Sequence, residues 1–359
     1  MKKRVAIVGA TGIAGQQAVV ALQDHPWFEI ALLAASERSA GKTYGEAIRD
    51  EKTGARRWWC SEEPQEHVLR MPVYDAATLN LRGVDVVFSC VESDVARELE
   101  PEWARTTPVI SNASAFRYEE DVPILVPGVN LEHARLLEIQ RKRRGWGGFI
   151  TPLPNCTTTG LVITLKPLFD HFGIERALVT SMQGISGAGR SPGVLALDIV
   201  DNVIPYIVGE EEKVARETGK ILGNLVEGGI APAQFPVSAT CTRAAVLEGH
   251  TEAVFVSLER EASIGDVAEC FREFGRSFVR LGLPSSPRRM ITVHEDPFRP
   301  QPRLDRDADG GMTTHVGRLR PDAALPRGVK YILLSHNTKM GAAKGAVLVA
   351  EYLAVEKYL

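Results

Sequence analysis

The sequence lacks a strong charge imbalance and any apolar run long enough to cross a membrane. Its 359 residues carry 42 Lys and Arg against 45 Asp and Glu, a net charge of −3 that gives no sign of a nucleic-acid or membrane-surface partner. No apolar stretch approaches the ~20 residues that a transmembrane helix needs. A hydrophobic content of 44% in a chain of this length is sufficient for two globular domains.

Cysteine is scarce and scattered. The five cysteines, Cys60, Cys90, Cys156, Cys241 and Cys270, are odd in number and form no CxxC pair. Neither a disulfide framework nor a zinc site is therefore indicated, and we predict no metal. A reducing, cytoplasmic compartment is the default expectation.

A glycine-rich turn follows the first apolar run. Residues 4–8 (RVAIV) predict a buried strand, and residues 9–15 (GATGIAG) follow with GxxGxxG spacing before a helix expected over 13–24. Such a turn lets the backbone approach a pyrophosphate at a helix N-terminus. The alternative is a strand–helix turn without a ligand. The predicted dinucleotide contacts are Gly9, Thr11, Gly12, Ile13 and Gly15.

The second strand, residues 28–35, ends in a polar loop. An acidic residue here suits the ribose 2′-hydroxyl of NAD, whereas arginine and hydroxyl groups suit the 2′-phosphate of NADP. The cationic and hydroxyl side chains outnumber Glu37, so the loop favours NADP, the alternative being a solvated loop. The predicted contacts are Ser36, Arg38, Ser39 and Lys42.

Two further strands (84–89 and 108–111), with a helix over 94–105 between them, predict a Rossmann-type, doubly wound α/β domain. Beyond residue 156 the pattern changes. Extended runs at 177–183 and 251–258 accompany helical runs at 191–203, 210–222 and 264–274. This indicates an α+β domain with a mostly antiparallel sheet.

Cys156 lies between a predicted strand (147–154) and an apolar helical run (161–169). A helix N-terminus favours an anion, so this place raises the thiolate fraction of a thiol whose ordinary pKa is about 8.5. The alternative is a small buried cysteine. His250 could accept a proton from Cys156 if the two meet in space, the alternative being a structural histidine.

Three cationic side chains, those of Arg117, Arg243 and Lys213, are candidate anion ligands. Arg243 stands seven residues before His250, so both can serve one site only if Gly249 or a turn breaks the strand between them. Arg117 follows the carboxyl end of a predicted sheet strand, where open α/β sheets bind ligands. Glu210 and Lys213 would share a helix face, although a solvated surface pair is the alternative.

Taken together, these segments resemble the aspartate-β-semialdehyde dehydrogenase family, in its archaeal and fungal-type branch. The matching stretches follow the family's order over nearly the whole chain. They are GATGIAGQ (9–16), AASERSAGK (34–42), SNASAFR (111–117), PNCTTTGL (154–161), MQGISGAG (182–189), DNVIPYI (201–207), EEEKVARETGKILG (210–223), CTRAAVLEGHTEAV (241–254), RPQPRLDRDADGGM (299–312), VGRLRPD (316–322) and SHNTKMGAAKGAVLVAE (335–351).

The resemblance implies a covalent mechanism. Cys156 is the expected nucleophile and His250 the acid–base group, with Gln183 and Asn155 positioning the acyl group. Cys156 would attack β-aspartyl phosphate, phosphate would leave, and NADPH would reduce the thioester to aspartate semialdehyde. This step belongs to lysine, threonine and methionine biosynthesis.

The resemblance also implies roles for the anion ligands. Arg243 would bind the substrate carboxylate. Arg117 and Lys213 would hold phosphate, with Glu210 ordering that region.

Further cofactor contacts follow from the same resemblance. Ser186 and Gly187 are expected near the cofactor and Asn337 at the nicotinamide, which returns the C-terminal helix (338–359) to the nucleotide domain. The expected domains are therefore 1–155 with 336–359 for NADP(H), and 156–335 for catalysis and dimerisation. A homodimer or homotetramer is expected, since members of the family are typically dimers or dimers of dimers.

The chain departs from the family pattern in three places, and substrate alternatives stay open. Glu is expected at Gly128, Asn-Gly at 310–311 and Asn-Arg-Val-Pro at 242–245. Malonyl-CoA reductases resemble the same branch and use the same Cys–His–NADPH machinery on a CoA thioester. N-acetyl-γ-glutamyl-phosphate reductase is a further relative, although the 299–322 segment fits it poorly. A Cys–His hydrolase without a cofactor and a non-catalytic NADP-binding regulator are the alternatives from other classes.

Overall fold

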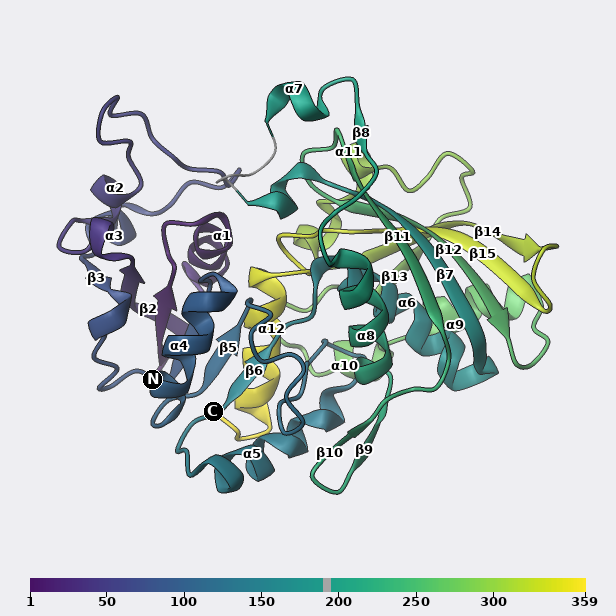
Figure 1. Ribbon diagram of the computed structural model, residues 1–359, viewed down its shortest axis with the longest axis horizontal. Coiled ribbons are helices and arrows are strands. Elements are labelled where there is room, and N and C mark those ends of the chain that lie inside the picture. The colour runs from purple at the N-terminus through teal and green to yellow at the C-terminus, as the bar shows by residue number, and fades with distance from the viewer. Residues whose placement is uncertain (190–194) are drawn as a thin grey trace. The chain divides into compact units, whose positions relative to one another are not determined.

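The computed structural model describes residues 1–189 and 195–359. The chain forms two compact units (Figure 1). The first contains residues 1–123, 133–153 and 342–359, and the second contains residues 124–132 and 154–341. These boundaries differ from the expected ones at residues 124–132 and by a few residues near 154 and 342.

The first unit is built on a parallel sheet in the order β3-β2-β1-β4-β5-β6. This is the doubly wound order of dinucleotide-binding folds, which confirms the predicted class. The strands are β1 (Lys3–Val8), β2 (Phe28–Ala35), β3 (Val73–Asp75), β4 (Val86–Ser89), β5 (Val109–Ser111) and β6 (Ile150–Pro152). Its helices are α1 (Ile13–Leu22), α2 (Tyr44–Ala47), α3 (Glu66–Leu69), α4 (Ser93–Ala104), α5 (Leu136–Arg144) and α12 (Ala343–Val355).

The C-terminal helix α12 belongs to this first unit. It packs against α1, and nearly every residue between Ala343 and Leu353 is buried. Burial on all sides suits its small and apolar sequence, AKGAVLVAEYLAV. The helix begins at Ala343 rather than at residue 338, because residues 337–342 form turns instead.

The second unit is built on a mixed sheet in the order β13-β14-β15-β12-β7-β11-β8. The pairs β13/β14 and β7/β11 are parallel, and the other neighbours are antiparallel. The strands are β7 (Ile174–Gln183), β8 (Val203–Ile204), β11 (Val237–Ala244), β12 (His250–Leu258), β13 (Ile291–Val293), β14 (Thr314–Asp322) and β15 (Gly328–Ser335). A separate hairpin pairs β9 (Asn224–Val226) with β10 (Gly229–Ala231).

Helices cover one face of the second sheet. They are α6 (Cys156–Phe172), α8 (Glu210–Ile221) and α9 (Ile264–Glu273), with shorter helices α7 (Ala196–Ile199), α10 (Arg276–Val279) and α11 (Pro302–Asp305). The helix α6 packs on β12 and β15 and also contacts α8 and α9 (Figure 1). Along β12, alternate residues from His250 to Val256 are buried toward this layer, as the period of a strand requires.

The helix expected over 191–203 was wrong in extent. Among the described residues, only Ala196–Ile199 is helical, and the prediction's residues 191–194 lie outside the described part. Leu195, Leu197 and Val200 are exposed, so within this chain they lack the apolar surface against which an amphipathic helix is stabilised. In the described part of the chain, no helix is both long and apolar enough to cross a membrane.

Candidate active site

Cys156 is the first residue of α6, as its sequence position predicted. Asn155 caps the helix, and its Oδ1 atom accepts hydrogen bonds from the N–H groups of Thr157 (2.9 Å) and Thr158 (3.4 Å). The cap orders the first turn, where the helix dipole favours negative charge. The N-terminus of α6 therefore supports the thiolate form of Cys156.

The structure brings His250 to Cys156. The Sγ atom of Cys156 lies 3.1 Å from the Nε2 atom of His250, the first residue of β12. His250 is fully buried, and burial followed by the charge of Arg243 lowers the pKa of its imidazole to about 3. The ring is therefore neutral near pH 7 and is a hydrogen-bonding partner for the sulfur rather than a resting cation.

A backbone group orients the imidazole. The N–H of Gly184 donates a hydrogen bond to the Nδ1 atom of His250 over 3.1 Å. Because a backbone N–H can only donate, Nδ1 is unprotonated in this geometry, and the neutral ring carries its hydrogen on Nε2, facing the sulfur. The sulfur is then the acceptor, a role that a thiolate fills better than a thiol.

Arg243 lies in the same cluster. It stands at the end of β11, and its Nη1 atom donates to the carbonyl oxygen of Gly184 over 2.8 Å. Burial lowers the pKa of its guanidinium, and the neighbouring Cys156 and Glu210 oppose that shift. The chain between Arg243 and His250 leaves the strand and turns at Gly249 (φ 95°), which is the break required for both to serve one site.

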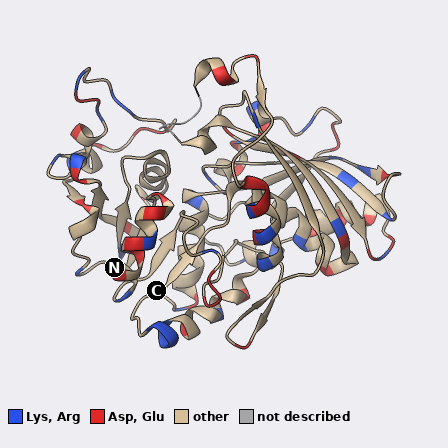
Figure 2. Cartoon of the chain, viewed as in Figure 1, with Lys and Arg blue, Asp and Glu red and all other residues tan. Residues whose placement is uncertain are grey.

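Acidic residues of α8 support Asn155. The Nδ2 atom of Asn155 donates to Glu210 over 2.8 Å, and its backbone N–H donates to Glu217 over 2.7 Å. The Nζ atom of Lys213 lies 3.8 Å from the second oxygen of Glu210, so this predicted pair forms. Figure 2 shows the acidic first turn of α8 in red.

The other predicted groups of the second unit have internal partners. Gln183, at the end of β7, is buried and donates to Ser181 over 3.1 Å. The Nδ2 atom of Asn337 donates to Ser186 over 2.8 Å. At Gly187, a Cβ atom would lie 3.1 Å from the Nη1 atom of Arg243, so glycine lets this turn approach the cluster.

The glycine-rich turn of the first unit has the geometry of a dinucleotide loop. Gly9 has φ 82°, and a Cβ atom there would lie 2.4 Å from the carbonyl oxygen of Cys90. At Gly15 a Cβ atom would lie 2.2 Å from the carbonyl oxygen of Gly9, so only glycine lets α1 pack this closely. Gly12 immediately precedes α1, which begins at Ile13. Thr11 lies in the turn, and its carbonyl accepts from the buried Gln16 over 3.1 Å.

The predicted 2′-phosphate ligands lie in the loop after β2, which contains a short 3-10 turn at residues 37–39. Ser36 and Arg38 are exposed and Ser39 is half-buried, whereas Lys42 forms an ion pair of 2.6 Å with Glu51. Arg38 is therefore more accessible to a phosphate group than Lys42 is. Arg117 also belongs to the first unit, where it is buried and donates to the carbonyl oxygens of Leu153 (2.8 Å) and Asn112 (3.2 Å).

Three supporting residues were missed by sequence reasoning. Glu217 lies two helical turns after Glu210, and this spacing on one face of α8 could have indicated it. Gly341 follows the SHNTKM stretch, and a Cβ atom there would lie 3.0 Å from the Cβ of Cys156. Gly184 acts through its backbone N–H, which no side-chain pattern reveals.

The departure at Gly128 has a structural counterpart. Gly128 has φ 72°, and a Cβ atom there would lie 3.2 Å from the Cε atom of Met290. A glutamate at this position would be strained in the left-handed region and would press on Met290. The backbone conformation at position 128 and the contact with Met290 therefore both favour glycine at this position.

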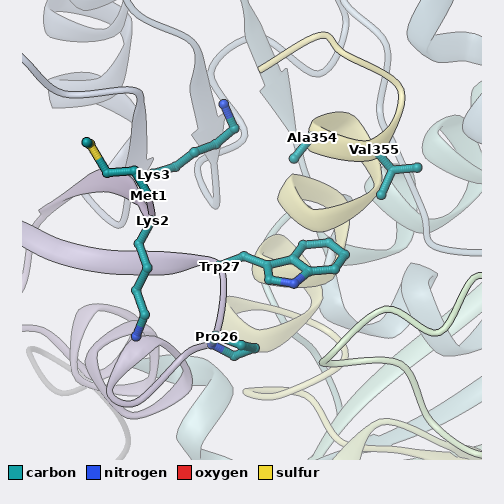
Figure 3. Close-up of a pocket in the computed structure, with 7 residues that line it drawn as sticks. All are labelled: Met1, Lys2, Lys3, Pro26, Trp27, Ala354 and Val355. Carbon is teal, nitrogen blue, oxygen red and sulfur yellow. The ribbon is translucent and has the colours of Figure 1, made fainter.

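Two other features do not form part of the site. A cavity of about 500 Å³ lies between the chain start and the end of α12, and its lining contains none of the predicted site residues (Figure 3). His294, Asp305 and His315 lie close enough to suggest a metal site. However, the two imidazoles hydrogen-bond each other at 2.9 Å, and Arg299 and the N–H of Gln301 bind the carboxylate of Asp305. The Nδ1 atom of His315 and the carboxylate of Asp305 are therefore already engaged, although the Nε2 atom of His315 is buried without a hydrogen-bond partner among the described residues, and we assign no metal to the group.

Comparison with known proteins identifies both halves of the chain. Residues 4–137 match the family model of the semialdehyde dehydrogenase NAD binding domain, and residues 165–340 match that of the semialdehyde dehydrogenase dimerisation domain. The aspartate-semialdehyde dehydrogenase of Methanothermobacter thermautotrophicus is 47% identical, over 97% of this chain and 98% of its own. That of Archaeoglobus fulgidus is also 47% identical, over the full length of both chains.

Solved structures agree with these relatives. The crystal structure of aspartate semialdehyde dehydrogenase with NADP from Candida albicans has a TM-score of 0.89 and 39% identity, and the similarity covers all of both chains. The Vibrio cholerae aspartate semialdehyde dehydrogenase II complexed with ASA has a TM-score of 0.77 and 28% identity over the same extent. The chain therefore belongs to the aspartate-semialdehyde dehydrogenase family.

Proposed function

We propose that this protein is an NADP-dependent aspartate-β-semialdehyde dehydrogenase that forms an acyl thioester on Cys156. The observation that carries the proposal is the Cys156–His250 contact of 3.1 Å at the start of α6, with Arg243 beside it. The NADP-bound relative at 39% identity supports NADP(H) as the cofactor. In the biosynthetic direction, NADPH would supply the hydride that reduces the thioester.

Four residues of the second unit have proposed roles in the reaction at Cys156. The sulfur attacks the acyl carbon, while His250 is the acid–base group and donates to the sulfur through Nε2. During turnover, the imidazole is proposed to return a proton to the departing sulfur. Asn155 and Gln183 are proposed to position the acyl group.

The anion ligands are proposed to select a small phosphorylated dicarboxylate. Arg243 suits the substrate carboxylate, because a guanidinium binds carboxylates through paired hydrogen bonds. Lys213 is proposed to bind phosphate, with Glu210 holding its ammonium group. Arg117 is proposed as a further phosphate ligand.

In the first unit, Gly9, Thr11, Gly12, Ile13 and Gly15 are proposed to bind the pyrophosphate. The 2′-phosphate is assigned to the loop after β2, with Ser36, Arg38, Ser39 and Lys42 as ligands.

Three groups of the second unit complete the proposed cofactor site. Ser186 and Gly187 lie in the turn after β7, and Asn337 follows β15. We assign the nicotinamide contact to Asn337.

A homodimer or homotetramer is proposed, formed through the uncovered face of the second sheet. Leu178 and Met182 of β7 are 39% and 37% exposed on that face, and apolar strand residues of this kind are typical of an interface. The family model for this half of the chain describes a dimerisation domain.

The substrate assignment is tested by following NADPH absorbance with the purified protein. Reduction of NADP by aspartate semialdehyde plus phosphate is expected, and oxidation of NADPH by malonyl-CoA is not. Activity with the CoA thioester alone would contradict the substrate, and no binding of NADP(H) by titration would contradict the oxidoreductase function.

A further inference from the structure

We propose that Asn337 is a positioning residue for the Cys156–His250 pair, in addition to any contact that it makes with the cofactor. The side-chain amide of Asn337 hydrogen-bonds both to Gly249, the residue before His250, and to Ser186, which lies in the turn after Gly184. The N–H of Gly184 binds the Nδ1 atom of the imidazole. The inference rests on the proposed function only in taking Cys156 as the nucleophile and His250 as its partner.

The Asn337 side chain bridges two separate segments. Its Oδ1 atom accepts a hydrogen bond from the N–H of Gly249 over 2.8 Å, and its Nδ2 atom donates to Ser186 over 2.8 Å. Only 3% of the residue is exposed, so both bonds form away from bulk solvent. One amide hydrogen remains for another partner, so a nicotinamide contact and this bridge are compatible but separable.

The first of these bonds acts on the backbone immediately before His250. Gly249 has φ 95°, a conformation that glycine adopts readily and other residues avoid. A Cβ atom at Gly249 would lie 3.1 Å from the Cδ1 atom of Leu334, so this turn is also closely packed. Without Asn337, the buried N–H of Gly249 would lose its partner, and the turn that aims the imidazole would be free to rearrange.

The second bond acts on the turn that holds the other ring nitrogen. Ser186 lies in the 3-10 turn Ile185–Ala188, directly after Gly184. The N–H of Gly184 donates to the Nδ1 atom of His250 over 3.1 Å, and its carbonyl accepts from Arg243 over 2.8 Å. Asn337 therefore ties together the two segments between which the imidazole is held.

The consequence concerns the reactivity of the thiol before any ligand binds. Among the described residues, Arg243 on β11 and His336 beside Asn337 act on the imidazole through their charges, and Cys156 on α6 contacts its Nε2 atom. Asn337 itself carries no charge. A change in the Cys156 reactivity profile on removing its amide would therefore report an altered arrangement of these groups.

The test measures alkylation of Cys156 by iodoacetamide across pH in cofactor-free protein. Mass spectrometry of the Cys156 peptide separates it from the other cysteines. Asn337→Ala is expected to slow alkylation near neutral pH by about tenfold and to move its midpoint to higher pH. Ser186→Ala removes only the hydrogen bond between Asn337 and Ser186, and it is expected to cause a smaller change in the same direction. This variant keeps the proposal testable if Asn337→Ala does not fold.

Tyr331→Phe is the matched control. It removes another buried hydrogen bond of the second unit, from Tyr331 to Thr164 (2.9 Å), and is expected to lower Tm without changing the alkylation profile. An Asn337→Ala alkylation profile identical to wild type, with only the Kd for NADP raised in a binding titration, would overturn the proposal and leave Asn337 as a cofactor ligand alone. No substrate is used, so failure of the substrate assignment would not affect the result.

Discussion

The Sγ atom of Cys156 lies 3.1 Å from the Nε2 atom of His250, although the two residues are 94 positions apart in the chain. The helix α6 supplies one and the strand β12 the other, and α6 packs directly on β12. Because His250 accepts the Gly184 N–H at Nδ1, its remaining hydrogen faces the sulfur. The pair is thus arranged to stabilise a thiolate at the start of a helix.

Cys156→Ser tests the nucleophile while changing the shape of the site very little. The hydroxyl is a far poorer nucleophile than a thiolate, so turnover is expected to fall by on the order of 10⁴-fold or more. NADP binding, measured by fluorescence titration, is expected to stay within about twofold of wild type because the cofactor contacts remain. Turnover within tenfold of wild type would contradict the assigned role.

The low pKa of His250 predicts a simple pH dependence for Cys156. Burial and Arg243 hold this pKa at about 3, so the ring stays neutral across the range in which the thiol ionises. Alkylation of Cys156 by iodoacetamide between about pH 5 and 9 should therefore rise through one ionisation. Two inflections, with the lower near the ordinary histidine pKa, would instead indicate a resting thiolate–imidazolium pair.

Arg38 is predicted to carry most of the preference for NADP. Its guanidinium is exposed in the turn after β2, whereas the ammonium of Lys42 is paired with Glu51. Arg38→Ser is expected to raise the Kd for NADP by about ten- to a hundredfold, as loss of a charge-assisted hydrogen bond would, and to leave the Kd for NAD unchanged. Lys42→Ala is the comparison variant and should raise the Kd for NADP less than Arg38→Ser does. If Arg38→Ser weakened the binding of NADP and NAD equally, the assignment would be contradicted.

The burial of Glu252 is expected to make the folded protein less stable as pH rises. It is fully buried beneath α6, where a Cβ atom at Gly160 would lie 3.5 Å from its Oε1, and the described residues offer neither carboxylate oxygen a hydrogen-bond partner. Burial raises its pKa well above 4.5. The folded protein therefore keeps this group protonated at pH values where the unfolded chain ionises it.

The sign of the effect follows from that difference. As pH rises above about 4.5, the unfolded state loses the proton first, so the free energy of unfolding falls by up to about 1.4 kcal/mol per pH unit until the folded pKa is reached. Glu252→Gln does not titrate, so its Tm relative to wild type should increase from pH 5 to pH 8. Glu261→Gln, at an exposed position, is the control. A constant Tm difference across this range would show that Glu252 is ionised in the fold.

The local features of the fold were predictable from sequence because each depends on neighbouring residues. The strand 28–35 has the bounds expected for it, and the glycine-rich turn precedes a helix at Ile13. Cys156 begins a helix because Asn155 caps it. The short-range rules of strand alternation, turn residues and capping are sufficient for such elements.

Features that depend on distant contacts were not predictable in the same way. The position of His250 against Cys156 requires the packing of α6 on β12, and the same packing buries Glu252 beneath α6. The role of Gly184 depends on a backbone N–H. The helix expected over 191–203 was too long, because Leu195, Leu197 and Val200 are exposed and only Ile199 of the described helical turn is buried.

The most direct test of the account is a pre-steady-state reaction without phosphate. The protein is mixed with aspartate semialdehyde and NADP, NADPH formation is followed by stopped flow, and the quenched protein is digested for mass spectrometry. The account predicts a burst of one NADPH per Cys156 and an aspartyl adduct on the Cys156 peptide, because the thioester has no phosphate to accept its acyl group. Absence of the burst, or an adduct on any residue other than Cys156, would contradict it.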